Sequence, residues 1–260
     1  MNPDRDIPEQ NAPVVEIFSG IQGEGIHAGR RHLFLRLAGC DLACDYCDQP
    51  EASRPPRTAR IETRAGGRDW RRPANPMSVE AVRAALTRLL QPPGLHHHAL
   101  SLTGGEPLLH SSFLSRLLAA LPAHPPVLLE TNGIRASALR ALLPYLDIVS
   151  MDIKLRSTTG RATPIKRHRA FLEVACRARS LYVKTVVCRG TTIREARTAA
   201  RLVAGAAPHA PLVLQPVTPG RRHRLKPPRP DALLALQAAA LELVEDVRVM
   251  PQMHRILGQR

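Results

Sequence analysis

Three cysteines crowd into one short stretch and offer the plainest chemistry in the sequence. Cys40, Cys44 and Cys47 follow a C-x3-C-x2-C spacing, which lets three thiolates converge on one inorganic site from a single loop. Thiolates are soft ligands that suit zinc or an iron–sulfur cluster. A structural zinc site needs four protein ligands, and no fourth cysteine or histidine is close in the sequence. Three thiolates on a four-iron cluster would leave one iron open to chelate a small molecule and pass it an electron.

A second group of polar residues stands at the ends of apolar runs. Thr103, Glu130, Asp152 and Gln215 each follow or close such a run, and Lys184 lies within another. In parallel barrels the carboxyl ends of the strands carry the active site. One such residue could be an ordinary helix cap or turn residue, but four at equivalent places indicate a site.

The elements that position these residues alternate regularly. Expected strands cover 14–18, 32–39, 100–103, 127–130, 147–152, 182–187, 211–215 and 247–250. Expected helices cover 78–90, 111–120, 137–143, 166–178, 192–204 and 231–244. This alternation predicts βαβ units and a parallel sheet. Because no nucleotide-fold glycine fingerprint is present, we expect an α/β fold with a barrel-like sheet, and a doubly wound sheet is the alternative.

The domain organisation is expected to be simple. We expect one domain over 14–260, preceded by a flexible lead over 1–13. Residues 51–76 differ in character, because they hold seven arginines and the only tryptophan, Trp70, with poor periodicity. This Arg-rich segment is expected to be an inserted loop or a short hairpin.

Composition excludes some classes of protein. The net charge is +15, but 33 of the 37 basic residues are arginine, which is typical of a GC-rich coding bias. Aromatic residues are 3%, too few for base-stacking platforms, so nucleic acid is not the favoured partner. No apolar stretch is long enough for a membrane span, and residues 1–10 do not resemble a signal segment. With so few cysteines for a disulfide scaffold, we expect a cytoplasmic protein.

Further motifs connect the cysteines to a known superfamily. Gly104-Gly105-Glu106-Pro107 follows an expected strand, as in the radical S-adenosylmethionine (SAM) enzymes, which carry a cysteine loop of this spacing. Within that superfamily the sequence resembles the 7-carboxy-7-deazaguanine synthases. The resemblance runs from about 14 to 260, does not cover 51–76, and is carried by residues 16–25, 29–30, 34–40, 44–48, 103–107, 130–133, 215–216 and 251–254.

The resemblance implies a reaction and its cofactors. The family converts 6-carboxy-5,6,7,8-tetrahydropterin to 7-carboxy-7-deazaguanine with release of ammonia, on the route to queuosine and other 7-deazapurines. It uses a 4Fe-4S cluster, S-adenosylmethionine and Mg²⁺. The reduced cluster cleaves the sulfonium, and the resulting 5′-deoxyadenosyl radical abstracts a hydrogen from the substrate. The resemblance also implies a partial (β/α)6 TIM-like barrel of the radical SAM type, a homodimer and an electron donor such as flavodoxin.

The same resemblance implies roles for particular residues. Cluster ligands would be Cys40, Cys44 and Cys47. The S-adenosylmethionine site would comprise Tyr46, Cys47, Asp48, Gly105, Asp152, Ile153, Lys154, Gln215, Pro216, Val217 and Thr218. The pterin site would comprise Ile21, Gln22, Gly23, Arg36 and Thr103. Glu24 and Arg36 would act in catalysis, Glu24 by hydrogen-bonding the pterin edge and Arg36 by binding a carboxylate in a bidentate fork.

Two departures from the family pattern leave questions open. The family usually has a threonine that ligates Mg²⁺ directly after Cys-Asp, and this sequence has Gln49 there. An amide oxygen is also a hard ligand, so Gln49 is a candidate metal ligand. Residues 151–154 also resemble activating enzymes of glycyl-radical proteins, which keeps a different radical substrate as an alternative. A second alternative is a metal-stabilised basic module that binds RNA.

Other candidate residues have ordinary interpretations. His96, His97 and His98 are expected to begin a strand at the amino-terminal edge of the barrel, away from the chemistry. His254 could reach the substrate or simply pack at the surface. Cys176 and Cys188 are expected to be buried thiols. The basic residues of 221–229 are expected to form a solvated loop after the sixth barrel strand, and a lid over an anionic ligand is the alternative.

Overall fold

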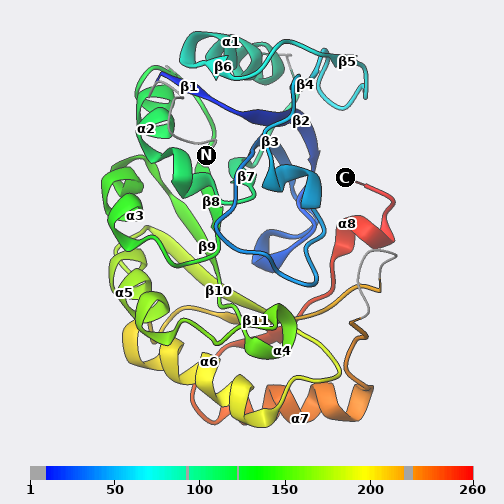
Figure 1. Cartoon of the computed structure of the whole chain (residues 1–260), viewed down its shortest axis with the longest axis vertical. Helices are drawn as coiled ribbons and strands as arrows, with labels where there is room; N and C mark the ends of the chain where they lie inside the picture. Colours follow the sequence, from blue (N-terminus) through cyan, green and yellow to red (C-terminus); the bar gives the residue numbers. More distant parts are fainter. Residues whose placement is uncertain (1–9, 92–93, 122, 220–224, 260) are drawn as a thin grey trace.

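A curved ten-stranded sheet forms the centre of the computed structural model, which describes residues 10–91, 94–121, 123–219 and 225–259 (Figure 1). The strand order is β12-β11-β10-β9-β8-β7-β3-β2-β4-β5. The seven strands β3 and β7 to β12 run parallel to one another, and β2 is antiparallel to β3. Their bounds are β2 (Val14–Ile21), β3 (Arg31–Leu37), β4 (Arg60–Glu62), β5 (Trp70–Arg71), β7 (Ala99–Gly104), β8 (Val127–Thr131), β9 (Ile148–Asp152), β10 (Ser180–Val187), β11 (Leu212–Pro216) and β12 (Val247–Val249).

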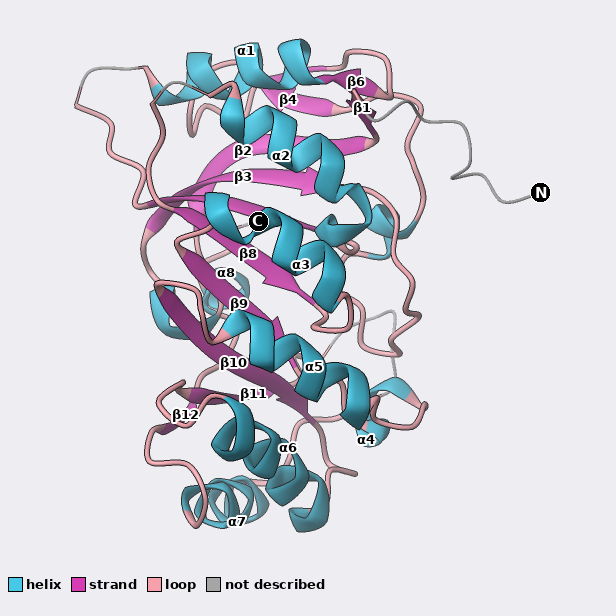
Figure 2. Cartoon of the chain, turned by 90° about the vertical axis from the view of Figure 1, so that its left-hand side faces the viewer, coloured by secondary structure: helices cyan, strands magenta, loops and turns pink. Residues whose placement is uncertain are grey.

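Six long helices connect the parallel strands and cover one face of the sheet (Figure 2). They are α1 (Val79–Leu90), α2 (Ser111–Ala119), α3 (Ala136–Leu142), α5 (Ile165–Ala175), α6 (Ile193–Ala206) and α7 (Pro230–Leu241). The shorter elements are η1 (Gly25–His27), η2 (Pro50–Ser53), η3 (Pro107–His110), η4 (Leu143–Tyr145), α4 (Arg156–Thr159) and α8 (Met253–Ile256). The main hydrophobic core lies between the sheet and these helices, so the opposite face is left for a site.

Local sequence signals explain where the helices begin and which face they bury. The side chain of Ser78 caps α1 by accepting a hydrogen bond from the Ala81 amide. Within α1, Val82, Leu86 and Leu89 recur at helical spacing and are fully buried against the sheet. At α6, Thr192 and Glu195 form a reciprocal capping box. The strands and long helices expected from the sequence all form, and their ends differ from the expected ones by a few residues.

The partial (β/α)6 barrel expected from the sequence is confirmed. One face of the sheet carries the long helices, whereas a doubly wound sheet would carry helices on both faces, so that alternative is wrong. In the parallel strands the register is continuous, for example Arg36 opposite Thr103 and Lys184 opposite Asp152. The carboxyl ends of these strands consequently meet along one edge. Among the described residues, none of the helices has the length and apolarity needed to cross a bilayer.

The structure adds detail to the expectations for residues 11–12, for the Arg-rich segment and for Cys176. Residues 11–12, expected in a flexible lead, form β1 (Asn11–Ala12) and pair with β6 (Met77–Ser78), because Ala12 and Met77 are both buried there. Within 51–76, β4 and β5 pair antiparallel, and β4 adds to the edge of the main sheet beside β2. Cys176 was expected to be buried but is exposed, because it follows the last turn of α5. Residues 221–224 of the expected basic loop lie outside the described residues.

A group of histidines packs near the amino-terminal ends of β3 and β7. The triplet at 96–98 precedes β7, which begins at Ala99, and His97 Nε2 lies 2.9 Å from Ser19 Oγ. His32 is fully buried, with Nδ1 2.8 Å from Ser101 Oγ. Burial, reinforced by neighbouring basic groups, lowers the pKa of His32 to about 3 and that of His97 to about 4. Both side chains are therefore neutral in the folded protein at neutral pH.

These buried histidines predict a loss of stability on mild acidification. Histidine in an unfolded chain titrates near pH 6.5, so between that pH and about pH 4 the unfolded state binds protons that folded His32 and His97 do not. The free energy of unfolding should therefore fall as the pH falls, by up to about 1.4 kcal/mol per pH unit for each histidine. Urea unfolding at pH 7 and pH 5 measures this. In His32→Gln the free energy of unfolding should differ less between pH 7 and pH 5 than in the unsubstituted protein. An unchanged difference would show that His32 does not carry the lowered pKa.

Candidate active site

The three cysteines of the loop after β3 face one cavity. Cys40, Cys44 and Cys47 all line a cavity of about 480 Å³ at the carboxyl ends of the parallel strands. Burial raises the pKa of the Cys40 thiol to about 11 and also raises the pKa values of Cys44 and Cys47. The thiols thus need a bound metal to become thiolates at neutral pH.

The remaining cysteines take no part in this cavity. Cys188 is buried and its Sγ lies 3.3 Å from the backbone oxygen of Ser157, while Cys176 is exposed at the end of α5. Among the described cysteines, only the three of the loop share the cavity. A three-thiolate set fits a four-iron cluster with one iron left for another ligand better than it fits a closed four-ligand zinc site.

Two glycines let the loop after β7 lie directly against the cysteine loop. A Cβ atom at Gly105 would lie 2.1 Å from the backbone oxygen of Gly39 and 2.9 Å from Cys40 Cβ. At Gly104, φ is +147° and a Cβ would lie 2.0 Å from the backbone oxygen of Leu37. Only glycine permits this approach, because any side chain would push the two backbones apart.

The following residue, Glu106, ties this loop to the end of β8. Its fully buried carboxylate accepts hydrogen bonds from the Leu108 amide, the Thr131 hydroxyl and the Asn132 amide, all within 3.0 Å. Burial raises the pKa of Glu106 to about 7 despite these bonds, which act in the opposite direction. The carboxyl group thus has a structural role, holding the loops after β7 and β8 at fixed positions.

On the far side of the cysteines, polar residues from the end of β9 enclose the cavity. Lys154 Nζ donates to Asp152 Oδ2 and to the Tyr46 hydroxyl, each at 2.7 Å. Burial alone would lower the pKa of Lys154, but Asp152 and its other neighbours hold that pKa well above its ordinary value. Tyr46, which belongs to the cysteine loop, is thereby connected to β9.

His168 holds the same stretch in place from α5. It is fully buried, and the backbone amide of Lys154 donates to its Nε2 at 3.1 Å. Since Nε2 accepts, Nδ1 carries the proton and donates to the backbone oxygen of Gly133 at 2.9 Å. The loops that follow β8 and β9 are therefore joined through one imidazole.

Three buried acceptor atoms in this part of the cavity lack a hydrogen-bond partner within the described chain. They are Asn132 Oδ1, Asp152 Oδ1 and Gln215 Oε1, and the three residues line the cavity together. Buried acceptors are nearly always satisfied in folded proteins. Their positions therefore fit a ligand that brings hydroxyl, amino or ammonium donors, such as a nucleoside joined to an amino acid.

The other part of the cavity is bounded by residues 21–24 and by the ends of β3, β7 and β8. Gln22 Nε2 donates to Glu130 Oε1 at 2.7 Å, and the Thr103 hydroxyl donates to Glu130 Oε2 at 2.8 Å. Ile21 and Gly23 line the same space, together with Arg36 of β3. This part offers amide, hydroxyl and carboxylate groups on a small apolar wall, which suits a flat heterocycle.

A buried ion pair links the two parts. Lys184 of β10 donates to Glu24 Oε2 and lies 3.6 Å from Asp152 Oδ2, and its side chain is 12% exposed. Burial by itself would raise the pKa of Glu24, but Lys184, the Gln252 amide and His254 together lower it to about 2. The pKa of Lys184 is held well above its ordinary value by Glu24 and Asp152, against the effect of burial. Glu24 is therefore ionised and Lys184 charged at neutral pH.

The chain's carboxyl-terminal segment closes this side of the site. The amide of Met253 donates to the backbone oxygen of Gly23 at 2.8 Å, which brings α8 against residues 21–24. Gln252 Nε2 then donates to Glu24 at 2.6 Å and to Asp48 at 3.3 Å. A carboxylate oxygen of Glu24, one of Asp48 and a ring nitrogen of His254 lie within 4.8 Å of one another, close enough to bind one metal ion together.

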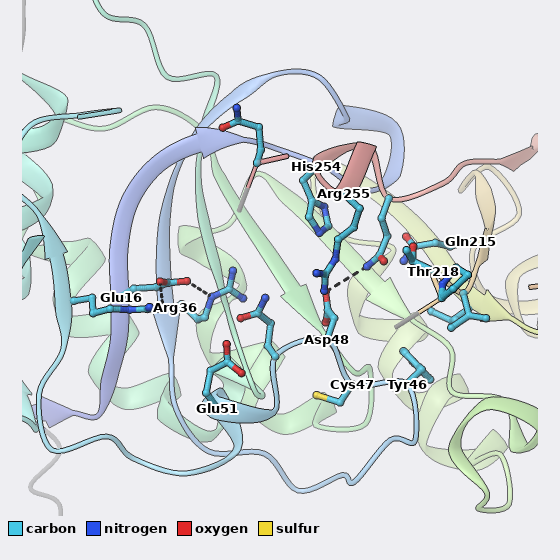
Figure 3. Close-up of a pocket in the computed structure, with 17 residues that line it drawn as sticks. Glu16, Arg36, Tyr46, Cys47, Asp48, Glu51, Gln215, Thr218, His254 and Arg255 are labelled. Atoms are coloured by element: carbon cyan, nitrogen blue, oxygen red, sulfur yellow. Dashed lines mark hydrogen bonds and ion pairs between the residues drawn. The ribbon is translucent and has the colours of Figure 1, made fainter. Parts of the chain in front are cut away.

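An adjoining cavity of about 460 Å³ shares Arg36, Cys47, Asp48 and Gln49 with the first (Figure 3). Glu16 and Arg36 lie on one side of it and Gln215 and Thr218 on the other, with Asp48, His254 and Arg255 between them. Gln49, which follows Asp48 in the sequence, lines both cavities.

Most residues assigned from the resemblance line one of these two cavities, and two do not. The residues that line a cavity are Ile21, Gln22, Gly23, Glu24, Arg36, Cys40, Cys44, Tyr46, Cys47, Asp48, Gln49, Thr103, Gly105, Asp152, Lys154, Gln215, Val217 and Thr218. Ile153 is fully buried in the main core, and Pro216 lines neither cavity. The resemblance assigned no role to Lys184 or Gln252, although both line the first cavity. One indication for Lys184 was present in the sequence, because a lysine within an apolar strand is unusual.

Comparison with known proteins gives three concordant findings. Residues 35–203 match the family model of the Radical SAM superfamily. The chain is 43% identical to a 7-carboxy-7-deazaguanine synthase of Geobacter sulfurreducens over 95% of this chain and 98% of the relative. It is 36% identical to a synthase of the same name from Methanothermobacter thermautotrophicus, over 96% and 98% of the two chains.

A solved structure shares the fold. The crystal structure of QueE from Escherichia coli superposes with a TM-score of 0.61 at 20% identity, covering 94% of this chain and 95% of the other. A structure of TYW1 with a lysine-pyruvate adduct bound shares the fold more distantly, with a TM-score of 0.56 at 14% identity, over 84% and 75% of the two chains.

Proposed function

Because this chain belongs to the Radical SAM superfamily and, within it, to the 7-carboxy-7-deazaguanine synthases, we propose that the two parts of its cavity divide the family's chemistry between them. The enzyme converts 6-carboxy-5,6,7,8-tetrahydropterin to 7-carboxy-7-deazaguanine with release of ammonia, in 7-deazapurine biosynthesis. Its cofactors are a 4Fe-4S cluster and S-adenosylmethionine. The observation that carries the proposal is that the three loop thiols share one cavity with the polar residues at the strand ends.

The cluster part of the cavity is assigned to Cys40, Cys44 and Cys47. When bound, the cluster and S-adenosylmethionine supply an electron and a carbon-centred radical. The protein contributes the position of these groups: Gly104 and Gly105 allow the cysteine loop to pack against β7, and Glu106 fixes the neighbouring loop.

S-adenosylmethionine is assigned to the side of the cavity formed by the cysteine loop, β9 and β11. The proposed contacts are Tyr46, Cys47, Asp48, Gly105, Asp152, Ile153, Lys154, Gln215, Pro216, Val217 and Thr218. Ile153 and Pro216 contribute only by shaping the backbone, since neither lines a cavity. The partnerless oxygens of Asp152 and Gln215 accept hydrogen bonds from ligand hydroxyl or amino groups.

The pterin is assigned to the part bounded by Ile21, Gln22, Gly23 and Thr103, with Glu24 and Arg36 as catalytic residues. Ionised Glu24 accepts hydrogen bonds from the N–H edge of the heterocycle. Arg36 binds the substrate carboxylate through its terminal nitrogens, because its Nε already donates to Glu16 at 3.0 Å. Together these residues orient the ring toward the cluster side of the cavity.

A divalent cation is assigned to Gln49, in the place of the family's threonine. We expect Gln49→Ala to weaken Mn²⁺ binding by about tenfold, since one of few protein oxygen ligands is lost. His254→Gln should leave Mn²⁺ affinity within about threefold, because the carboxylates of the Glu24, Asp48 and His254 group are already held by Lys184 and Gln252. Electron paramagnetic resonance of Mn²⁺ titrated into the cluster-loaded enzyme measures both. The reverse order of effects would assign the cation to the histidine-containing group.

Partners beyond the substrate also belong to the proposal. An acidic electron donor such as flavodoxin suits a chain of net charge +15. A homodimer is supported by the exposed apolar side chains of α7, which include Leu234 at 66% and Leu241 at 47% exposure. A cytoplasmic location suits a cluster held by free thiols.

One assay tests the proposed function. Reduced, cluster-reconstituted enzyme is incubated anaerobically with S-adenosylmethionine and 6-carboxytetrahydropterin, with and without Mg²⁺, and the products are separated by mass. We expect 7-carboxy-7-deazaguanine and ammonia, with faster turnover when Mg²⁺ is present. Accumulation of 5′-deoxyadenosine without any deazapurine would instead indicate a radical enzyme acting on another substrate.

A further inference from the structure

Three charged residues stand side by side across neighbouring strands at the edge of the site. Glu16 of β2 is paired in register with Arg36 of β3 and with Arg60 of β4. Its carboxylate is only 3% exposed and accepts from both guanidinium groups, from Arg36 Nε at 3.0 Å and from Arg60 Nη2 at 2.7 Å. Arg36 is 9% exposed and lines both cavities, so this row of charges reaches the pterin part directly.

The balance of charge in this row decides how strongly Arg36 can attract an anion. Arg36 and Glu16 alone would make a neutral buried pair, whose field on a nearby carboxylate is weak. Arg60, which lines the 460 Å³ cavity together with Glu16 and Arg36, adds a second positive charge, so these three groups together carry one net positive charge. Arg36 and Glu16 are buried and the Arg60 side chain is 27% exposed, so solvent screens this charge only in part.

The geometry of the row also orients Arg36. The carboxylate of Glu16 binds Arg36 through Nε, which directs the fork of terminal nitrogens away from the carboxylate and toward the cavity. Glu16 can hold this orientation only if it is itself fixed, and Arg60 binds its second oxygen, Oε2. A bidentate fork is sensitive to orientation, so a small rotation of Arg36 costs affinity for a carboxylate.

Arg60 is in turn held by the segment 51–76. The Trp70 ring centroid lies 5.8 Å from the Arg60 guanidinium carbon, and Trp70 also lies 6.5 Å from the ring of Phe18. Trp70 begins β5, which pairs with β4 through Glu62 and Ile61. The hairpin thus presents Arg60 to Glu16 with its charge stacked on an aromatic face.

We propose that Arg60 is a positioning residue for the recognition of the substrate's carboxylate, acting on Arg36 through Glu16. This rests on the proposed role of Arg36 and extends it to a segment that the family resemblance does not cover. The role is selective: it concerns the carboxylate of the pterin and neither the pterin ring nor S-adenosylmethionine.

The test compares two pterins that differ in the carboxylate. KM is measured for 6-carboxytetrahydropterin, and 6-methyltetrahydropterin, which lacks the carboxylate, is measured as a competitive inhibitor. We expect Arg60→Met to raise the KM about tenfold while the inhibition constant of the methyl compound and the KM for S-adenosylmethionine change by less than about threefold. Arg71→Met is the matched control, because Arg71 is an exposed arginine of the same hairpin, and it should change none of these constants.

A double-mutant cycle separates positioning through Glu16 from a direct contact between Arg60 and the substrate. If Arg60 acts through Glu16, adding Arg60→Met to Glu16→Gln should raise the KM by less than about threefold, because the carboxylate that links Arg60 to Arg36 is already gone. Trp70→Leu should produce a weaker change than Arg60→Met, with the same selectivity. Equal weakening of both pterins by Arg60→Met, or a tenfold rise in KM that persists in the Glu16→Gln background, would overturn the proposal. Failure of the unsubstituted enzyme to use the carboxylated pterin would instead count against the proposed function.

Discussion

Cys44→Ala is expected to abolish turnover, reducing it by at least about a thousandfold, and to reduce the iron content well below that of an intact 4Fe-4S cluster. With only two thiolates from the loop, the cluster loses one of its three protein ligands, and no other described cysteine lines the cavity to replace it. Iron analysis and the absorbance of the anaerobically reconstituted protein measure the cluster, and the product assay measures turnover.

The matched control for this variant is Cys176→Ala. Cys176 is exposed at the end of α5 and lines neither of the two cavities described, so its removal should leave both iron content and turnover unchanged. A Cys44→Ala enzyme that kept a full cluster and most of its activity would show that the loop thiols do not hold the reactive centre. Loss of iron in Cys176→Ala would indicate that the cysteine count alone, and not this loop, governs reconstitution.

Lys184→Met is expected to have the second largest effect, both on stability and on turnover. The substitution leaves Glu24 without its cation in a buried position, and it also removes a charge 3.6 Å from Asp152. Breaking a buried ion pair by removing one partner typically lowers the free energy of unfolding by about 3–5 kcal/mol. Turnover should fall by at least about a hundredfold, because misplaced Glu24 and Asp152 no longer orient their ligands.

The pH dependence of this variant gives an independent check. Without Lys184, burial is opposed by fewer groups, so the pKa of Glu24 rises from about 2 and its ionised form is lost at higher pH than in the unsubstituted enzyme. The acidic limb of the activity profile should therefore move to higher pH. In Glu24→Gln/Lys184→Met the buried charge is gone, so stability should recover substantially while turnover stays low. A double variant as unstable as Lys184→Met would contradict the coupling of the two residues.

Local sequence patterns were sufficient to predict the ligand-bearing cysteine loop and the polar residues at the carboxyl edge of the sheet. The spacing of Cys40, Cys44 and Cys47 acts within one loop, and Thr103, Asp152 and Gln215 lie where strands end, so both could be read without knowing tertiary contacts. Parallel pairing then brings the strand ends to one edge, as the register of β3, β7, β9 and β10 shows.

Strand alternation explains why a contiguous motif is not a contiguous site. Asp152 and Lys154 face the cavity while Ile153 between them is buried in the main core, and Gln215 and Val217 line a cavity while Pro216 does not. Successive side chains along an extended backbone point to opposite faces, so only every second residue of such a stretch can touch a ligand.

Contacts between distant residues were beyond sequence reasoning. Lys184 and Glu24 are 160 residues apart, and Gln252 is 228 residues from Glu24, so nothing in the local pattern pairs them. Arg60 is one of seven arginines in the segment 51–76, and only the hairpin shows that it pairs with Glu16. The exposure of Cys176 likewise depends on where α5 ends on the sheet.

The claim on which the account depends is that the three loop thiols hold a cluster with one iron free for S-adenosylmethionine. The most direct measurement is the electron paramagnetic resonance spectrum of the reduced, reconstituted enzyme before and after S-adenosylmethionine is added. We expect the cluster signal to change when S-adenosylmethionine is added, because the new ligand binds iron. At equal ligand concentration the change should be smaller in Asp152→Asn, which lacks one carboxylate of the proposed ligand site. A cluster signal that stays the same at saturating S-adenosylmethionine would contradict the claim.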